Sequence, residues 1–300
     1  QMVPVINTGL MRILFVTDGA VDEEDIAEFK SVGTVSDEVR EASLESGRFS
    51  DKNFLDFDGD FTAEIRDEES RFHLNILARR NTSKTLQESP IALQLYGLMS
   101  GDEHDLWFSR RNLDRWELIA NLADWVDEDN SRAGGLGGYE DNLYNNLDSP
   151  YLTKNAPFDS LEEVRQVEGW QDEVFERFED QITVWGTGKI NINSADDDVL
   201  WGLLKAYVTP TPTDSLVEHL LELIQEYKLL ANFENGKAFV NWLEGQGLEV
   251  DSSLGSQLTD SSRTFTITST GLVGSSATTI TSVVSYTTSS EGKVLFWRVD

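Results

Sequence analysis

The sequence predicts an α+β protein with a helical domain inserted between the strands of an antiparallel sheet. Three observations support this fold class. Apolar residues recur at helical spacing in residues 5–17, helical patterns dominate residues 84–260, and β-branched residues become frequent from residue 263 to the end. Helices repeat about every 3.6 residues and strands every second residue, so pattern alone separates the two kinds of segment. We expect an N-terminal helix that packs on the sheet.

The first 83 residues are predicted to hold this helix, an acidic region and two strands. Residues 18–60 are acidic and interrupted by Gly and Ser, so we expect a loop with a short helix. Residues 61–66 and 71–77 are expected to form a β-hairpin around the polar turn at residues 67–70.

The middle of the chain is predicted to be helical. The expected helices are residues 85–99, 112–126, 161–167, 172–178, 195–207, 213–230 and 236–243. Ser194 is the expected N-cap of the helix that starts at Ala195, with Asp196 and Asp197 in its first turn. Residues 128–158 are rich in Gly, Asn and Pro and form a long predicted loop, and loops of this length are usually functional or tied down.

Three strands are predicted to close the chain as an antiparallel meander, in residues 264–269, 278–286 and 293–298. Neither this meander nor the hairpin is large enough to be stable alone, so we expect them to pair into one sheet. The predicted domains are residues 1–83 and 261–300, which share the sheet, and the inserted helical domain 84–260. Within the insert we expect two helical groups, residues 84–180 and 190–255.

Composition excludes several classes of function. The 300 residues carry a formal charge of −30, which disfavours nucleic acid because its binding depends on Lys and Arg. There is no Cys, so thiol catalysis and disulfides are excluded, and the three His are far apart in sequence. No run approaches the roughly 20 apolar residues that a membrane helix needs. The chain begins with Gln1 rather than Met, so we expect a shortened or processed chain from which a targeting or membrane element has been removed.

A group of acidic residues near the end of the predicted helix 112–126 is the best candidate for a site. Carboxylates without neighbouring His or Cys suit a hard cation such as calcium. An EF-hand is excluded, because Arg132 and Gly138 occupy positions 6 and 12 of the register that starts at Asp127. The alternative is a solvated acidic helix end. The candidate metal ligands are Asp124, Asp127, Asp129, Glu140 and Asp141.

Other motifs are weaker. Asp56, Asp58 and Asp60 surround a Gly and fit a turn better than a cation site. Residues 189–195 resemble the entry to a helix-hairpin-helix module, but the glycine hairpin is absent and three acids follow, so we expect a structural role. No GxSxG, HExxH or P-loop pattern occurs, so we predict no catalytic residues and no enzyme, with a metal-dependent hydrolase as a less favoured alternative.

Several segments in fixed order resemble the GspK family, the large minor pseudopilins of the type II secretion system. Any one of them alone is weak, but together they extend over most of residues 60–300. They are residues 67–75 (DEESRFHLN), 122–129 (LADWVDED), 139–144 (YEDNLY), 150–151 (PY), 155–157 (NAP), 160–164 (SLEEV), 190–195 (ININSA) and 265–271 (FTITSTG).

The resemblance implies a pilin-like core with an inserted helical domain similar to SAM or helix-hairpin-helix modules. It implies a structural protein at the pseudopilus tip that helps initiate assembly, with GspI- and GspJ-like partners. It also implies a periplasmic location, with an inner-membrane anchor that precedes this chain in the full-length protein. Calcium is associated with the family's helical insert near the segment that matches residues 124–144, which favours the five acidic ligands named above. The alternative is a minor pilin or tip adhesin of a type IV pilus-like filament. The glycines at residues 134–138 and the long acidic region 18–60 depart from the family pattern.

Overall fold

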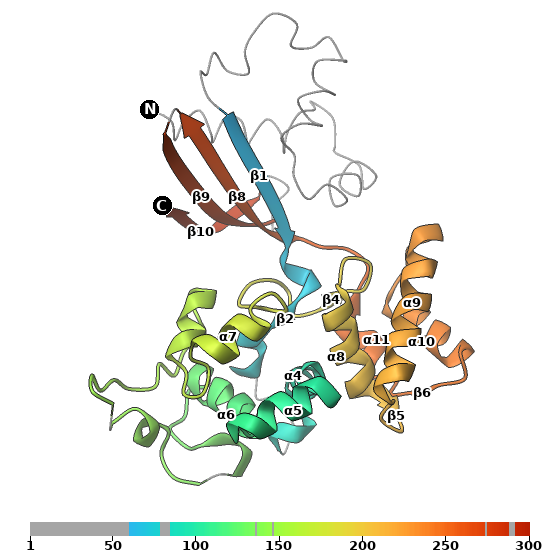
Figure 1. The fold of residues 1–300 in the computed structure, drawn as a ribbon, viewed down its shortest axis with the longest axis horizontal. Coiled ribbons are helices and arrows are strands. Elements are labelled where there is room, and N and C mark those ends of the chain that lie inside the picture. Colours follow the sequence, from blue (N-terminus) through green and yellow to red (C-terminus); the bar gives the residue numbers. More distant parts are fainter. Residues whose placement is uncertain (1–59, 79–84, 136, 146, 274, 288–291) are drawn as a thin grey trace, which may run out of the picture. The chain divides into compact units, whose positions relative to one another are not determined.

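A computed structural model describes residues 60–78, 85–135, 137–145, 147–273, 275–287 and 292–300. The expected helix at residues 5–17 and the acidic region before residue 60 lie outside the described residues. The chain divides into two compact units, one built from Gln1–Asp67 with Thr264–Asp300 and one from Glu68–Arg263. In sequence, the second unit is an insertion between two strands of the first (Figure 1).

The first unit contains a four-stranded antiparallel sheet in the order β1-β8-β9-β10. Its strands are β1 (Asp60–Asp67), β8 (Thr264–Val273), β9 (Ser276–Ser285) and β10 (Lys293–Val299). Ile267 lies opposite Ile65 and is buried with Ala63, because alternate residues of a strand share one face. The predicted C-terminal meander is therefore confirmed, and β1 joins it as the fourth strand.

The predicted hairpin at residues 61–77 is wrong. β1 pairs with β8, and the chain then enters a 3₁₀ turn at Glu68–Ser70. The following strand β2 (Phe72–His73) pairs in parallel with β3 (Ile182–Thr183) of the helical unit. Phe72 is fully buried in the helical core. Alternation of apolar residues indicates a strand but does not show which strand it pairs with. The strand that is nearest in sequence was therefore the wrong partner to expect.

The second unit is mainly helical and surrounds one large apolar core. Its helices are α4 (Pro90–Leu98), α5 (Asp102–Arg111), α6 (Arg115–Val126), α7 (Asp172–Phe178), α8 (Asp197–Tyr207), α9 (Asp214–Leu230), α10 (Gly236–Gly245) and α11 (Leu254–Gln257). Two small strand pairs tie the later part together: β4 (Ile190–Asn191) with β7 (Leu258–Thr259), and β5 (Val208–Thr209) with β6 (Glu249–Val250).

Helices α4 and α8 pack at very short range through two glycines. A Cβ atom built on Gly97 would lie 2.2 Å from the carbonyl oxygen of Gly202, and one on Gly202 would lie 3.0 Å from the ring of Phe72. Because a backbone atom cannot move aside as a flexible side chain can, the helix crossing requires glycine at position 97. This contact joins α4, the first α-helix of the insert, to α8 in its later part.

Three differences between predicted and observed helices have local causes. α4 begins at Pro90 rather than at residue 85, because proline is favoured in the first helical turn. α8 is capped by Asp196, whose side chain accepts from the Val199 amide, and not by Ser194. α5 was not predicted, because Phe108 is its only buried residue and it has no repeating apolar pattern. The helix is indicated instead by the distribution of its charged residues. Its acids fall in the first turn and Arg110 and Arg111 in the last, which suits the helix dipole.

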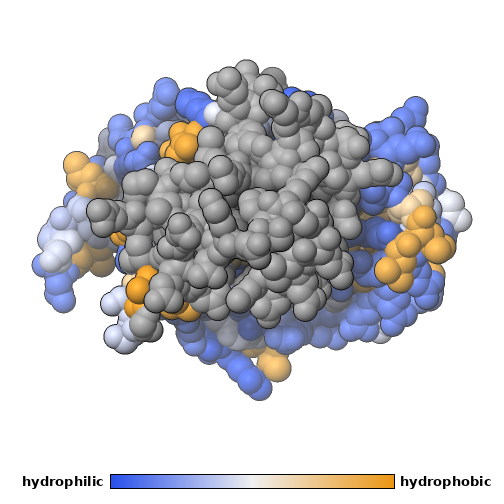
Figure 2. All heavy atoms as spheres, turned by 90° about the horizontal axis from the view of Figure 1, so that it is seen from above, coloured by the Kyte–Doolittle hydropathy of each residue, from blue (hydrophilic) through white to orange (hydrophobic). Residues whose placement is uncertain are grey.

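On the face shown in Figure 2, the described residues that can be seen are mostly hydrophilic, with separate apolar patches. None of the helices in the described ranges is both long and apolar enough to cross a bilayer.

Candidate metal site

The candidate site begins where α6 ends. Asp114 caps the helix by accepting a hydrogen bond from the Glu117 amide, and the side chains from Leu118 to Val126 are buried. Asp127 is the C-cap residue, in an extended conformation, with its own amide still bonded to Ala123. The free carbonyl groups of a helix end carry partial negative charge, so a buried carboxylate there is unfavourable unless a cation compensates it.

The chain then folds back on itself through a glycine-rich turn. A β-bridge joins Ser131 to Tyr139, and the Glu140 amide donates to the carbonyl oxygen of Asn130 at 3.4 Å. The turn contains Gly134 and Gly138 with φ of 67° and 93°, a region that residues with a side chain rarely adopt. The glycines therefore return Glu140 to the acids at the end of α6.

Three of the five predicted ligands meet. Asp127, Asp129 and Glu140 each offer a carboxylate oxygen, and these oxygens lie within 4.8 Å of one another. Asp127 is 4% exposed and Glu140 is 1% exposed. Neither carboxylate oxygen of Glu140 accepts a hydrogen bond from the described part of the chain. Burial, reinforced by the neighbouring acids, raises the pKa of Glu140 to about 8.

Such a group fits a hard divalent cation. Calcium takes oxygen ligands, above all carboxylates, and would replace the hydrogen bonds that Glu140 lacks. A buried carboxylate without a partner is costly, and mutual repulsion adds to the cost. The donors present therefore match calcium, and their role as ligands stays a prediction.

The other two predicted ligands point to different partners. One oxygen of Asp124 accepts from the Ala133 amide at 2.6 Å, and the other lies 4.0 Å from Nε of Arg132. Burial raises the pKa of Asp124 to about 6. Asp141 accepts from the Thr153 amide at 3.0 Å. Both acids hold the loop in shape beside the cluster of three.

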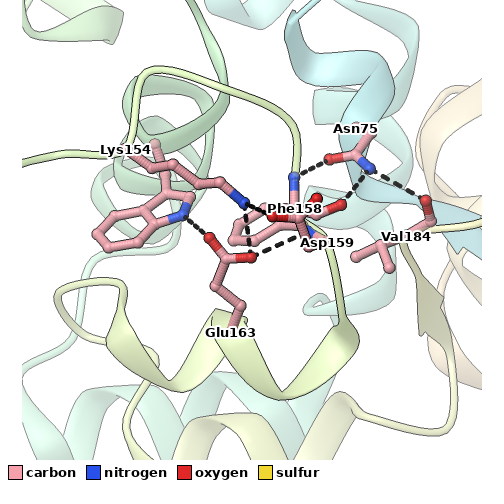
Figure 3. Close-up of polar contacts among 7 residues, drawn as sticks. Asn75, Lys154, Phe158, Asp159, Glu163 and Val184 are labelled. Carbon is pink, nitrogen blue, oxygen red and sulfur yellow. Dashed lines mark hydrogen bonds and ion pairs between the residues drawn. The ribbon is translucent and has the colours of Figure 1, made fainter. Parts of the chain in front are cut away.

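A polar network that was not predicted anchors the far end of the loop (Figure 3). Lys154 donates to Asp159 and Glu163 at 2.8 and 2.9 Å, and the Trp125 indole donates to the other oxygen of Glu163 at 3.0 Å. Asn75 accepts from the Phe158 amide at 2.7 Å and donates to the carbonyl of Val184. Sequence spacing could not predict these contacts, because the residues that form them are separated by up to 109 residues.

The other motifs singled out in the sequence contribute to the fold where the structure describes them. Asp56 and Asp58 lie outside the described residues, and Asp60 begins β1. In the helix-hairpin-helix-like entry, Asn193 accepts from the Phe233 amide at 2.8 Å and donates to its carbonyl at 3.0 Å. Asn191 donates to Ser262. These bonds support the structural role expected for that motif.

Comparison with known proteins gives one consistent family. Residues 70–187 match the model of the family described as type II secretion system (T2SS), protein K. Type II secretion system protein K of Klebsiella pneumoniae is 27% identical over 149 residues, which cover 49% of this chain and 43% of the relative. The protein K of Pectobacterium carotovorum subsp. carotovorum is 28% identical over 140 residues, 45% of this chain and 39% of the relative. The match thus spans less than half the length of these relatives.

The fold has a solved counterpart. A chain in the crystal structure of the GspK-GspI-GspJ complex from the enterotoxigenic Escherichia coli type 2 secretion system superposes with a TM-score of 0.56. The superposition covers 87% of this chain and 95% of that chain, at 19% sequence identity. At this identity the likeness shows the fold, and it agrees with the α+β class predicted from the sequence.

Proposed function

We propose that this chain, which belongs to the type II secretion system protein K family through its residues 70–187, is a structural minor pseudopilin of the pseudopilus tip. The observation that carries the proposal is the insertion of a complete helical unit, Glu68–Arg263, between strands β1 and β8. A filament that grows from its base forms its tip first. A subunit with a large body added to its sheet can begin such a filament but leaves little room for a further subunit above it.

The proposed partners are the other minor pseudopilins of the tip, GspI- and GspJ-like proteins. The superposed structure is of a GspK-GspI-GspJ complex, which supports this choice. The proposed location is the periplasm, with anchoring in the inner membrane before incorporation into the pseudopilus. The family supports this location, because protein secretion of this type operates across the periplasm.

The proposed role of the acidic cluster is structural rather than catalytic. A catalytic metal needs an open coordination position for water or substrate. Asp127 and Glu140 are almost completely buried, which suits an ion enclosed by protein oxygens. When bound, calcium would supply two positive charges against the three carboxylates of Asp127, Asp129 and Glu140. These residues would then fasten the returning loop to the end of α6.

Association with purified partners tests the tip assignment. The chain should form a stable complex with a co-expressed pair of GspI- and GspJ-like pseudopilins in size-exclusion chromatography with light scattering. In cells, deletion of the corresponding gene should abolish secretion and a full-length copy should restore it. Absence of any complex together with normal secretion after deletion would refute the proposal, whatever the outcome for the cation.

A further inference from the structure

The segment of residues 153–156 lies against the end of α6. The Asn155 side chain donates from Nδ2 to the side-chain oxygen of Asn130 at 2.9 Å. The Ala156 amide donates to the carbonyl of Trp125 at 3.4 Å. Asn155 is therefore bound to Asn130, one residue after Asp129, and its neighbour Ala156 is bound to Trp125, two residues before the ligand candidate Asp127.

The same segment also contacts the returning strand of the loop. The Thr153 amide donates to the Asp141 carboxylate at 3.0 Å, one residue after Glu140. Residues 153–156 thus bridge the two parts of the chain that carry the clustered carboxylates. Asn155 lies in the middle of this bridge.

The Asn155 side chain carries a buried amide oxygen. Its Oδ1 atom is buried and accepts no hydrogen bond from the described residues. Its backbone has φ of 51°, the left-handed region that Asn tolerates better than most residues. A buried amide oxygen without a partner is unfavourable, and a bound cation would satisfy it.

We propose that Oδ1 of Asn155 is a neutral oxygen ligand of the cation held by Asp127, Asp129 and Glu140. This inference rests on the cation site of the proposed function. Calcium takes six to eight oxygen ligands, and a side-chain amide adds one without adding to the repulsion among three carboxylates. Magnesium keeps several of its waters, so a protein-supplied fourth ligand favours calcium over magnesium.

Ligation by Asn155 would connect three segments of the chain. A cation bound to Asn155 joins the end of α6, the returning loop and residues 153–156. Lys154, within this segment, is already tied to Asp159 and Glu163 (Figure 3). Cation binding would therefore fasten the end of α6, Glu140 and residues 153–156 to one another.

The test is a calcium titration of metal-free protein by isothermal calorimetry, repeated in excess magnesium. Asn155→Gly removes the oxygen and keeps a residue that accepts the left-handed backbone. Asn155→Asp keeps an oxygen at the same position. Asn112→Gly is the matched control, because Asn112 ends α5 with φ of 52° and lies outside the cluster.

We expect Asn155→Gly to weaken calcium binding by at least about tenfold, the lower range for losing a supporting group of a metal site. Asn155→Asp and Asn112→Gly should bind calcium no more weakly than the wild type. Magnesium should compete better against Asn155→Gly than against the wild type.

Three results would overturn the proposal. Unchanged affinity in Asn155→Gly would show that the oxygen binds only water. Equal weakening in Asn155→Gly and Asn155→Asp would show that the amide acts through the fold. A wild-type protein that binds no calcium would refute the cation site itself, while the pseudopilin assignment would still be judged by complex formation.

Discussion

Two regions of the helical unit differ in whether their buried polar groups have hydrogen-bond partners. Around α8 and α9, Lys205 donates to Asp214 at 2.6 Å and to the carbonyl of Pro212 at 2.8 Å, and Asn193 completes two bonds with Phe233. Around the end of α6, Glu140 is buried and neither of its carboxylate oxygens accepts a hydrogen bond from the residues that the structure describes. The polar groups of the first region are satisfied by the protein itself, whereas the proposed function assigns a cation to the second.

The stability of the two regions should depend differently on the calcium concentration. A buried group with an internal partner contributes equally in calcium and in chelator. Buried carboxylates without hydrogen bonds contribute favourably only when an ion is bound, by the linkage between binding and folding. Variants in the two regions should therefore differ in their response to calcium more than in their average effect.

The largest expected effect comes from the contact between α4 and α8. Gly97→Val places a side chain against the backbone of α8, where a Cβ atom added at Gly97 would lie 2.2 Å from the Gly202 oxygen. Overpacking against backbone should cost about 3 kcal/mol or more. Urea unfolding followed by circular dichroism should show this loss equally with calcium and with chelator. A loss confined to chelator would contradict the separation of the two regions.

The effect of Glu140→Gln on the free energy of unfolding should depend on whether calcium is bound. In excess calcium we expect the variant to be less stable than the wild type by about 2–3 kcal/mol, because binding at a hundredfold excess over Kd contributes about 2.7 kcal/mol. In chelator the variant should be as stable as the wild type or more so, because a pKa of about 8 keeps Glu140 mainly protonated at pH 7, and the amide of Gln replaces a neutral carboxyl group of the same shape. Thermal unfolding in both conditions measures the difference.

The contrary outcome is equally clear. If Glu140→Gln lowered stability by the same amount in calcium and in chelator, Glu140 would have an internal role and no ion would be needed. Glu222→Gln, on the exposed side of α9, is the matched control and should leave both curves unchanged.

Lys205→Met should weaken the self-contained region moderately. The variant keeps most of the buried stem. It leaves the Pro212 carbonyl and one carboxylate oxygen of Asp214 without the Lys205 donor, while the other oxygen of Asp214 still accepts from the Asp102 amide. We expect a loss of about 1–3 kcal/mol, the usual cost of an unsatisfied buried group. Chemical denaturation should give the same loss with and without calcium, and a calcium-dependent loss would weaken the comparison.

The smallest expected effect is a pH dependence at His104, in α5. Burial, aided by the Arg177 guanidinium, lowers the pKa of His104 to about 4. The unfolded state therefore binds more protons between pH 4 and 6.5, and stability falls as pH decreases through that window. His104→Gln should reduce the fall measured by urea unfolding at pH 7 and pH 5 in chelator. An identical fall in both proteins would contradict the lowered pKa. Other ionisable groups near His104 are Glu103, Asp105, Arg115 and Asp214.

Much of the fold could be predicted because its signals are local. The strands after residue 263 alternate, and α9 repeats buried residues at Val217, Leu220 and Ile224, so each was recognised from pattern. The family resemblance and the α+β class are confirmed by the comparisons and the structure. The partner of residues 71–77 could not be predicted, because pairing with β3 depends on a contact 110 residues away in sequence.

The candidate site was predictable in composition and less so in geometry. Acids at a helix end indicate an oxygen-ligand site, and this pattern identified Asp127, Asp129 and Glu140. The sequence could not separate them from Asp124 and Asp141, because the distinction depends on which backbone amides approach each carboxylate. Nor could it single out Asn155, which we propose as a further ligand because its buried side-chain oxygen has no partner in the described part of the chain.

Hydrogen exchange of the backbone amides, followed by mass spectrometry in calcium and in chelator, tests the central claim most directly. The account predicts that calcium slows exchange in residues 124–158 and leaves residues 190–258 unchanged. Equal exchange of residues 124–158 in both conditions would contradict it, because the end of α6 would then be complete without a cation.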